Sequence, residues 1–374
     1  MTIQIPLSAP DIGEGEIAAV TSVLRTPRLS LGERLTEFES AMATFCGCAH
    51  AVAVSSGTAA LHLALLAAGI AEGDEVIVPS FAFIAVANAV RYVGAVPVFA
   101  DIDPDSLNIS PAAVEAAITS RTRALIVVHT FGVPAAIDEL LEVAHRYNLR
   151  LIEDACEAIG GEYAGKKLGS FGFAGVFGFY PNKQITTGEG GMLVTDDLRA
   201  ASQARMQRNQ GRGNGSDWFE HQCVGYNYRI SEINCALGVL QLARLDEILA
   251  NRSAVAQMYF ARLRDIPDLQ LPPMTVPRGT ISWFVYVVRL PQRLGSAGRD
   301  RVAKFLTDRG IGCARYFAPI HLQPAYQSVS HRCTDLAHTE SVAQRTLALP
   351  FFNQLTGDQV AQVCDALRDA LAIS

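Results

Sequence analysis

The stretch from Ala51 to Ala100 decides the fold class: AVAVSSGTAALHLALLAAGIAEGDEVIVPSFAFIAVANAVRYVGAVPVFA. It contains short runs of apolar, mostly β-branched residues, which are Ala51–Val54, Glu75–Val78 and Val96–Ala100. The helix-like segments Thr58–Ala68 and Ala85–Val93 separate these runs. Strands that are apolar on both faces and joined by helices predict a largely parallel sheet covered on both sides. The fold class is therefore α/β.

The same alternation continues toward the middle of the chain. The further strands we expect are Ala124–Val128, Arg150–Ile152, Val176–Phe179 and Met192–Val194, and the further helices are Pro111–Ile118 and Ala136–Tyr147. In such sheets ligands bind beyond the carboxyl ends of the strands. The polar motifs described below follow several of these strands, so we expect them to form a single site.

The composition changes after the last of these strands. A polar, Gly-rich segment, RMQRNQGRGNGSD, covers residues 205–217, and a long helical pattern over about Ser231–Leu263 resembles a spacer between domains. The remaining residues predict a smaller α+β unit. Its expected elements are a strand at Ser282–Leu290, with Trp283 and Phe284 as core residues, and helices near Arg299–Arg309 and Gly357–Leu371. We therefore expect a large domain over residues 1–245 and a small C-terminal domain over residues 246–374.

The bulk properties exclude several classes of protein. The 374 residues carry a net charge of −6, which argues against a nucleic-acid-binding protein, because such proteins usually present a basic face. The N-terminus lacks the pattern of a signal peptide, and the most apolar stretch, Ala59–Ile70, is too short to span a bilayer. A cytoplasmic location is the expectation. The eight cysteines are scattered, which predicts reduced thiols and no metal site.

Two segments carry residues that suit catalysis. In FGFYPNKQITTGEGGM (177–192), Lys183 lies between a strand-like run and a Gly-rich turn, and in RLIEDACE (150–157), Asp154 directly follows an apolar strand. Taken singly, Lys183 is read as a surface lysine and Asp154 as a helix N-cap. Together they are the pair that pyridoxal phosphate (PLP) requires. The lysine forms a Schiff base with the cofactor, and the aspartate keeps the pyridine nitrogen protonated.

Two further segments suit the rest of such a cofactor. In VSSGTAALHL (54–63), Gly57 and Thr58 lie in a turn between a strand and a helix, where backbone N–H groups bind phosphate. The nucleotide P-loop and the dinucleotide fingerprint are both absent. In VPSFAFIA (78–85), Phe83 follows the second strand and can stack on a planar ring. The ordinary alternatives are a simple N-cap for the turn and a core position for Phe83.

These segments, in this order, resemble the DegT/DnrJ/EryC1/StrS family of sugar aminotransferases. The resemblance covers nearly the whole chain, through SGTAALHLAL, GDEVIVPSFAF, PVFADIDPDSLNI, EDACEAIG, FYPNKQITTGEGGM, GYNYRISEINCALG and PIHLQPAY. It implies a fold-type-I PLP aminotransferase, with a mostly parallel sheet in the large domain and a smaller α+β domain. It also implies a homodimer whose active sites lie at the subunit interface.

The resemblance further implies a role for each matching residue. Lys183 corresponds to the Schiff-base lysine and Asp154 to the partner of the pyridine nitrogen. Phe83 corresponds to the ring-stacking aromatic residue, and Gly57 and Thr58 to the phosphate turn. Glu157 takes the position beside the phenolic oxygen of the cofactor. Asn227 corresponds to the asparagine that the neighbouring subunit donates to the phosphate, and His321 lies in a segment that borders the sugar-nucleotide pocket.

Two positions distinguish this chain within the family. Many relatives carry a phosphate-binding serine five residues before the lysine, whereas this chain has Gly178. Losing a hydrogen bond to a charged group costs roughly 1.5–3 kcal/mol unless another donor substitutes for it. Many relatives carry glutamine or histidine where this chain has Glu157. Glutamate there, together with TTGEGGM after the lysine, is similar to the GDP-perosamine synthase-like enzymes, which aminate the sugar at C-4.

The expected function is the transfer of an amino group from L-glutamate to a nucleotide-linked keto-sugar, in amino sugar and polysaccharide biosynthesis. One alternative is the same chemistry on a 3-keto sugar, and another is a non-catalytic regulatory protein that keeps the PLP fold. A sugar dehydratase of the family has histidine at the lysine position, so Lys183 argues against it. The arginines Arg205, Arg208 and Arg212 fit either a substrate diphosphate or a solvated loop. The nucleotide, the stereochemistry of the sugar and any oligomer beyond a dimer stay open.

Overall fold

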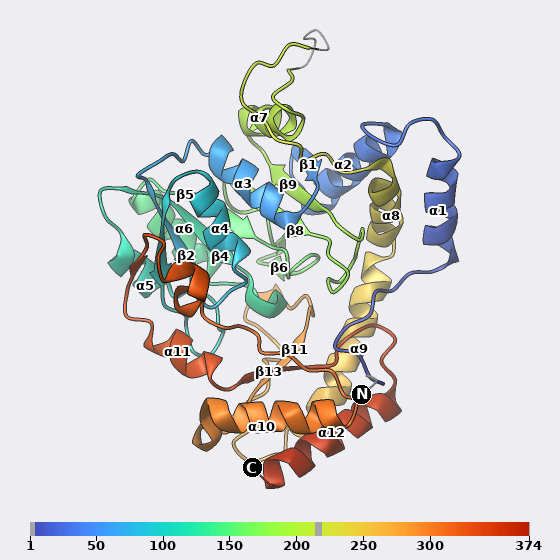
Figure 1. Ribbon diagram of the computed structural model, residues 1–374, viewed down its shortest axis with the longest axis vertical. Coiled ribbons are helices and arrows are strands. Elements are labelled where there is room, and N and C mark those ends of the chain that lie inside the picture. The colour runs from blue at the N-terminus through green and yellow to red at the C-terminus, as the bar shows by residue number, and fades with distance from the viewer. Residues whose placement is uncertain (1–3, 214–218, 374) are drawn as a thin grey trace.

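The computed structural model describes residues 4–213 and 219–373, and its centre is an eight-stranded sheet (Figure 1). The strand order is β1-β9-β8-β5-β4-β2-β3-β12. Neighbouring strands are parallel except at β9, which runs antiparallel to both β1 and β8. This confirms the α/β class and the largely parallel sheet. The strands are β1 (His50–Val54), β2 (Glu75–Pro79), β3 (Val96–Ala100), β4 (Thr122–Val128), β5 (Arg150–Asp154), β8 (Ala174–Gly178), β9 (Gly191–Thr195) and β12 (Arg332–Cys333).

Helices cover both faces of the sheet, because alternate strand residues point to opposite sides. Val76 and Ile126 pack with α3, α4 and α7, whereas Ile77 and Leu125 pack with α5 and α6. At the β1 edge, α2 and α8 continue the second layer. The helices are α1 (Glu14–Leu24), α2 (Glu33–Cys46), α3 (Gly57–Ala67), α4 (Ala85–Tyr92), α5 (Pro111–Ala117), α6 (Ile137–Arg146), α7 (Leu198–Arg208) and α8 (Glu232–Ala243).

A second core lies at the end of the molecule where α10 and α12 run side by side, and α9 leads to it from α8 (Figure 1). It contains an antiparallel strand pair, β11 with β13. The strand expected at Ser282–Leu290 is shorter, since only its second half pairs. The elements of this part are α9 (Leu245–Leu263), β11 (Tyr286–Arg289), α10 (Gly295–Asp308), α11 (Ala337–Ala343), β13 (Thr346–Leu349) and α12 (Gly357–Ala372).

Short elements complete the chain. A three-stranded sheet has the order β10-β6-β7. Single turns of 3-10 helix connect other elements. The bounds are β6 (Glu162–Tyr163), β7 (Lys166–Lys167), β10 (Gly279–Thr280), η1 (Thr130–Gly132), η2 (Gln292–Leu294), η3 (Ile320–Leu322) and η4 (Pro324–Tyr326). Within the described ranges, no helix is both long enough and apolar enough to cross a membrane, and no three His, Cys, Asp or Glu side chains gather as metal ligands do.

Contacts cross the division expected between residues 245 and 246, which itself stays a prediction. Ile5 packs in the C-terminal core and forms a bridge with Ile311. In the other direction, Arg332 and Cys333 add β12 to the large sheet by pairing with β3. The N-terminal segment thus packs in the C-terminal core, and a strand from the C-terminal part extends the large sheet.

Two segments differ from the sequence-based expectation. The helical pattern over Ser231–Leu263 is two helices, which meet at Arg244. The guanidinium of Arg244 binds Glu16 at 2.7 Å and Asp11 at 3.3 Å, and these partners lie far away in the sequence. The polar segment at 205–217 begins inside α7, and its residues from 214 onward lie outside the described ranges, together with Trp218.

A buried carboxylate, that of Glu153 in β5, binds the backbone of the loop between β7 and β8. It is fully buried and accepts hydrogen bonds from the backbone N–H groups of Gly169, Phe171 and Gly172, at 2.8, 2.6 and 2.9 Å. The ring of His129 lies 3.1 Å from its second oxygen. Both carboxylate oxygens therefore face donors, and none of their described neighbours offers an acceptor to an amide.

We predict that Glu153→Gln lowers the apparent free energy of unfolding by about 2–4 kcal/mol, because an NH2 group placed among donors leaves hydrogen bonds unmade. Chemical denaturation measures the change. The control is Glu142→Gln, an exposed residue paired with Arg146, which should change stability by about 0.5 kcal/mol or less. Equal stability of Glu153→Gln and wild type would contradict the prediction.

Candidate active site

Three segments meet at the carboxyl edge of the sheet, as the sequence predicts. A Cβ atom added to Gly57, at the start of α3, would lie 2.9 Å from Sγ of Cys156 and 3.3 Å from Cα of Gly178. Gly57 follows β1, Cys156 follows β5 and Gly178 ends β8. The turn after β1, the segment after β5 and the loop that carries Lys183 therefore converge with no space between them for a further side chain.

Lys183 lies in the loop that joins β8 to β9. Its side chain is about one-sixth exposed, and its Nζ lies 3.9 Å from Oε1 of Glu157 and 4.1 Å from the centroid of the Phe284 ring. Its N–H donates to the carbonyl of Tyr180 at 2.9 Å, and its own carbonyl accepts from Nη2 of Arg252 at 3.2 Å. The amine is thus partly accessible, while the backbone that carries it is fixed at both ends.

Glu157 is buried at the centre of this group. Burial raises the pKa of its carboxyl group, while the charge on Lys183 and the N–H of Phe131 act in the opposite direction. The Phe131 N–H donates to Oε2 at 2.8 Å, so Oε1 is the oxygen that faces Lys183. A carboxyl group of raised pKa can hold a proton on Oε1 and act there as a hydrogen-bond donor.

Asp154 ends β5 and is nearly buried. Its Oδ1 accepts from the N–H of Cys156 at 3.0 Å, and its carbonyl accepts from the N–H of His129 at 3.2 Å. Its charge is felt at both Cys156 and Glu157, where it raises the pKa of each group. Asp154 therefore lies close enough to Glu157 for the two carboxyl groups to interact, and its role in a cofactor site stays a prediction.

The start of α3 offers backbone donors to an anion. The Ser56 Oγ caps the helix by accepting from the N–H of Ala59 at 3.1 Å. The N–H groups of Gly57 and Thr58 belong to the first turn of the helix, so they have no acceptor within it. These amides and the helix dipole make the turn suitable for a phosphate group.

Asn227 lies beside this turn but does not enter the group around Lys183. The Ser55 N–H donates to the carbonyl of Tyr228 at 2.9 Å, and the buried His62 of α3 packs 4.7 Å from the Tyr226 ring and bonds the Tyr228 hydroxyl at 3.1 Å. Asn227 between the two tyrosines is exposed, and its side chain makes no hydrogen bond within the described residues.

Phe83 and His321 both lie on the β2 side of the site, but the side chain of Phe83 is exposed whereas the ring of His321 is hydrogen-bonded. Phe83 is 63% exposed, so it is not the core residue of the ordinary alternative, and its ring is free to cover a ligand. The ring of His321 is held by Ser80, 2.7 Å from Nδ1, and Glu340, 3.2 Å from Nε2. Since both ring nitrogens are occupied, His321 fixes the loop that follows β2.

Phe284 and Arg252 are site residues that the sequence did not indicate. Phe284 reads as a core residue of the expected strand at Ser282–Leu290, yet its ring faces Nζ of Lys183. Arg252 is one arginine in a long helical pattern, yet it reaches the backbone of Lys183. Hydrophobic periodicity could identify neither role, because both depend on how α9 and the segment before β11 pack against the loop.

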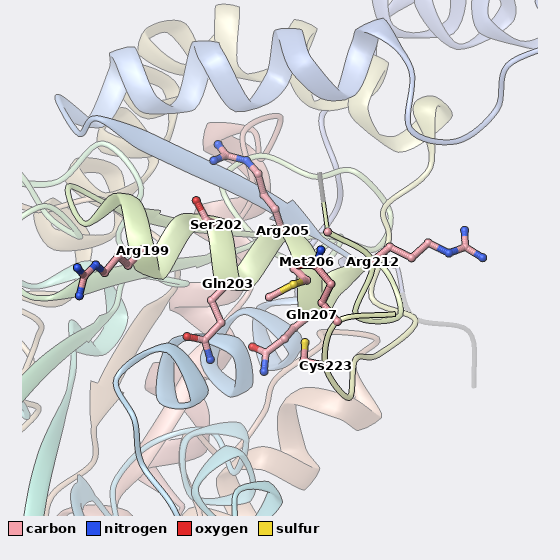
Figure 2. Close-up of a pocket in the computed structure, with 10 residues that line it drawn as sticks. Arg199, Ser202, Gln203, Arg205, Met206, Gln207, Arg212 and Cys223 are labelled. Carbon is pink, nitrogen blue, oxygen red and sulfur yellow. The ribbon is translucent and has the colours of Figure 1, made fainter. Parts of the chain in front are cut away.

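Two of the three arginines expected to meet a diphosphate, Arg205 and Arg208, bind groups within the protein. Arg205 donates to the carbonyl of Ala51 at 2.9 Å, and Arg208 to the carbonyl of Ala53 at 2.6 Å and to Glu39. A cavity of about 500 Å³ lies between α7 and the segment that includes Cys223, and Figure 2 shows the side chain of Arg205 leaving α7 on the side opposite to Gln203. None of the Lys183 group lines this cavity.

Comparison with known proteins identifies the family. The model of the DegT/DnrJ/EryC1/StrS aminotransferase family matches residues 10–368. The chain is 43% identical to a GDP-perosamine synthase of Caulobacter vibrioides over 98% of both chains. It is 38% identical to the spore coat polysaccharide biosynthesis protein SpsC of Bacillus subtilis, over 98% of this chain and 96% of that one.

Solved structures extend the similarity to the fold. The crystal structure of DesV from S. venezuelae superposes with a TM-score of 0.90, at 38% identity and with 98% of both chains covered. PseC of Helicobacter pylori, an aminotransferase involved in the biosynthesis of pseudoaminic acid, superposes with a TM-score of 0.92 at 28% identity, over 99% of this chain and 100% of that chain. These matches confirm the fold-type-I aminotransferase architecture, and the chain belongs to the DegT/DnrJ/EryC1/StrS family of aminotransferases.

Proposed function

We propose that this chain is a PLP-dependent enzyme that moves an amino group from L-glutamate to C-4 of a nucleotide-linked 4-keto-6-deoxy sugar. The observation that carries the proposal is the Nζ of Lys183 beside the buried Glu157, next to Asp154 and to the open start of α3. The similarity to a GDP-perosamine synthase over nearly the whole chain supports the nucleotide-linked sugar and the C-4 position.

The residues present fit PLP. A phosphate requires close approach to backbone amides, and at Gly57 even a Cβ atom would crowd Cys156 and Gly178. A pyridine nitrogen requires an anionic partner, which Asp154 provides at the end of β5. An aldehyde requires a lysine amine that is accessible but held in place, and Lys183 meets both conditions.

When bound, PLP supplies a protonated ring that withdraws electrons from the substrate carbon as that carbon loses its proton. The side chains of this chain do the rest. Lys183 would hold the cofactor through its amine, and the same amine, when free, would take the α-proton of glutamate and return a proton to the sugar carbon. Asp154 would keep the ring nitrogen protonated, and Glu157, in its protonated form, would donate a hydrogen bond to the phenolic oxygen. Nitrogen leaves glutamate, which becomes 2-oxoglutarate, and arrives on the sugar.

The proposal includes a homodimer in the cytoplasm, in which Asn227 of one subunit reaches the phosphate bound by the other. Three facts support the dimer. Asn227 is exposed beside the phosphate turn, Phe83 is 63% exposed, and Val224 near Asn227 is 83% exposed. A second copy would cover these side chains. His321 remains a predicted residue of the sugar-nucleotide pocket. Because both of its ring nitrogens are already hydrogen-bonded, its role there is to shape the wall of the pocket.

The decisive experiment is the absorbance spectrum of the purified protein with PLP, before and after L-glutamate. For wild type we expect a Schiff-base absorbance band near the visible range that glutamate bleaches. For Lys183→Ala we expect no such band and a transamination rate lower by at least about 10²- to 10⁴-fold. The control is Lys166→Ala, an exposed lysine in β7. A wild-type protein that binds PLP without bleaching would instead favour the regulatory alternative. NMR of the product from a 4-keto sugar nucleotide distinguishes C-4 from C-3 amination.

A second prediction concerns the proton on Glu157. Because burial raises the pKa of this carboxyl group, it is protonated below the raised pKa and becomes charged as pH rises through it. Charged Glu157 would repel the phenolic oxygen, so we expect the affinity for PLP to fall on the alkaline side. Glu157→Gln keeps a donor and an acceptor of the same shape, so it should bind PLP with a flatter alkaline limb. Glu157→Leu should bind weakly at every pH. An equal alkaline fall in wild type and Glu157→Gln would contradict this role.

A third prediction concerns the phosphate donor missing at Gly178. A Cβ atom at this position would lie 3.2 Å from Sγ of Cys156, so a serine there requires the thiol to move. We predict that the double variant Gly178→Ser with Cys156→Ala binds PLP about tenfold more tightly than wild type, through a new hydrogen bond to the phosphate. Gly178→Ser alone should gain less. Equilibrium dialysis of PLP measures both. A double variant that binds no better than Cys156→Ala alone would contradict the prediction.

A further inference from the structure

Arg252 is a buried cation without an ion-pair partner among the residues that the structure describes. It lies in α9 and is 2% exposed. Desolvation lowers the pKa of its guanidinium to about 10, while the charge of Asp11 acts in the opposite direction. Burying such a charge is costly unless hydrogen bonds replace its water. An apolar side chain at this position would therefore make the core more stable, so stability alone does not explain Arg252.

The hydrogen bonds of Arg252 all go to backbone carbonyls next to the reacting amine. Nη1 donates to the carbonyl of Phe284 at 3.0 Å and, more weakly, to that of Trp283 at 3.5 Å, and Nη2 donates to the carbonyl of Lys183 at 3.2 Å. The Cζ of Arg252 lies 5.5 Å from the centroid of the Phe351 ring, which limits its tilt. One planar, rigid group thus joins the Lys183 loop to the segment before β11.

Both ends of this connection shape the position of Nζ. The carbonyl of Lys183 is the acceptor of one bond, and the ring of Phe284, whose carbonyl accepts the other, lies 4.1 Å from Nζ. The guanidinium therefore acts, together with the hydrogen bonds from Gln184 to Ser282, on the distance between the lysine backbone and the aromatic surface against which its amine lies. A lysine side chain has many rotamers, so a fixed backbone and a fixed contact surface together limit the positions of its amine.

We propose that Arg252 is a positioning residue for Lys183, which holds the lysine carbonyl and the Phe284 peptide in one arrangement so that the amine returns to the same place after each release. This rests on the proposed function in one respect, that Lys183 is the reacting lysine. Small displacements of a reacting group are costly, since an error of about 1 Å can lower a rate about 10²-fold. The guanidinium fork is essential, because an ammonium group cannot donate to both carbonyls in this fixed geometry.

The test compares Arg252→Lys and Arg252→Met with Arg299→Met. Arg299 is a second buried arginine, in α10, which donates to the carbonyl of Ala343 and pairs with Asp300, away from Lys183. The first readout is the rate at which the apo-protein forms an imine with PLP, trapped by borohydride and located by peptide mass mapping. We expect both Arg252 variants to slow imine formation at Lys183 by about tenfold or more, and Arg299→Met to leave it within about twofold despite a loss of stability.

A second readout does not depend on PLP. Reductive methylation of the apo-protein, quantified at Lys183 relative to the exposed Lys166, reports how the amine is held. We expect this ratio to rise at least about threefold in both Arg252 variants, because the amine leaves the Phe284 ring. The variant Phe284→Leu should shift it in the same direction, and its effect should not add to that of Arg252→Met, because both act through one contact.

The outcomes separate this proposal from the proposed function. If Arg252→Lys and Arg252→Met lose stability as Arg299→Met does, while imine formation and the methylation ratio stay at wild-type values, Arg252 is structural only and the proposal is wrong. If Arg252→Met does not fold, Arg252→Lys gives both readouts. If wild type forms no imine at Lys183 yet the methylation ratio rises in the variants, the positioning role stands and the proposed function fails.

Discussion

The start of α3 lies directly against the ends of β8 and β9, and the arrangement of the site depends on this contact. A Cβ atom at Gly191, the first residue of β9, would lie 2.3 Å from the carbonyl oxygen of Ser56, a distance that real side chains do not tolerate. Because β9 is antiparallel to β8, the loop between them begins and ends at the carboxyl edge. The turn with free amides and the loop with Lys183 therefore share one edge, with Asp154 beside them at the end of β5.

Backbone groups, more than counter-charges, hold the polar side chains near Lys183. Glu157 takes an N–H from Phe131, and Arg252 donates to the carbonyls of Phe284 and Lys183. Glu153, one residue before Asp154 and on the other face of β5, binds three backbone amides. Peptide dipoles fixed by secondary structure do not reorganise when a charge moves nearby, which suits a site where a proton leaves and returns. The same side chain–backbone hydrogen bonds thus stabilise the fold and fix the orientation of these polar groups.

The sequence predicted the sheet and its polar edge closely, because buried strands and turn residues are local signals. The expected strand Val96–Ala100 matches the structure, and Ala85–Val93 differs from α4 by one residue. The direction of β9 could not be predicted, since an apolar run carries no sign of its orientation. The break lies at Arg244, whose partners Glu16 and Asp11 are more than two hundred residues away. The family resemblance, rather than periodicity, supplied the roles expected for Asn227 and His321, and the occupied ring of His321 is visible only in three dimensions.

Arg252 shows why the position of Lys183 depends on the whole chain and not on its own loop. Its helix, α9, begins beside the large sheet and continues into the C-terminal core, where Tyr259 donates to the carbonyl of Pro350 at 2.8 Å and stacks on Tyr286. A shift of this core would move α9, and the guanidinium would carry that movement to the carbonyl of Lys183. Changes in the packing of the C-terminal part should therefore alter the reactivity of Lys183 even where they touch no ligand. The two cores thus meet beside Lys183, where Arg252 and the hydrogen bonds from Gln184 to Ser282 join its loop to the segment before β11.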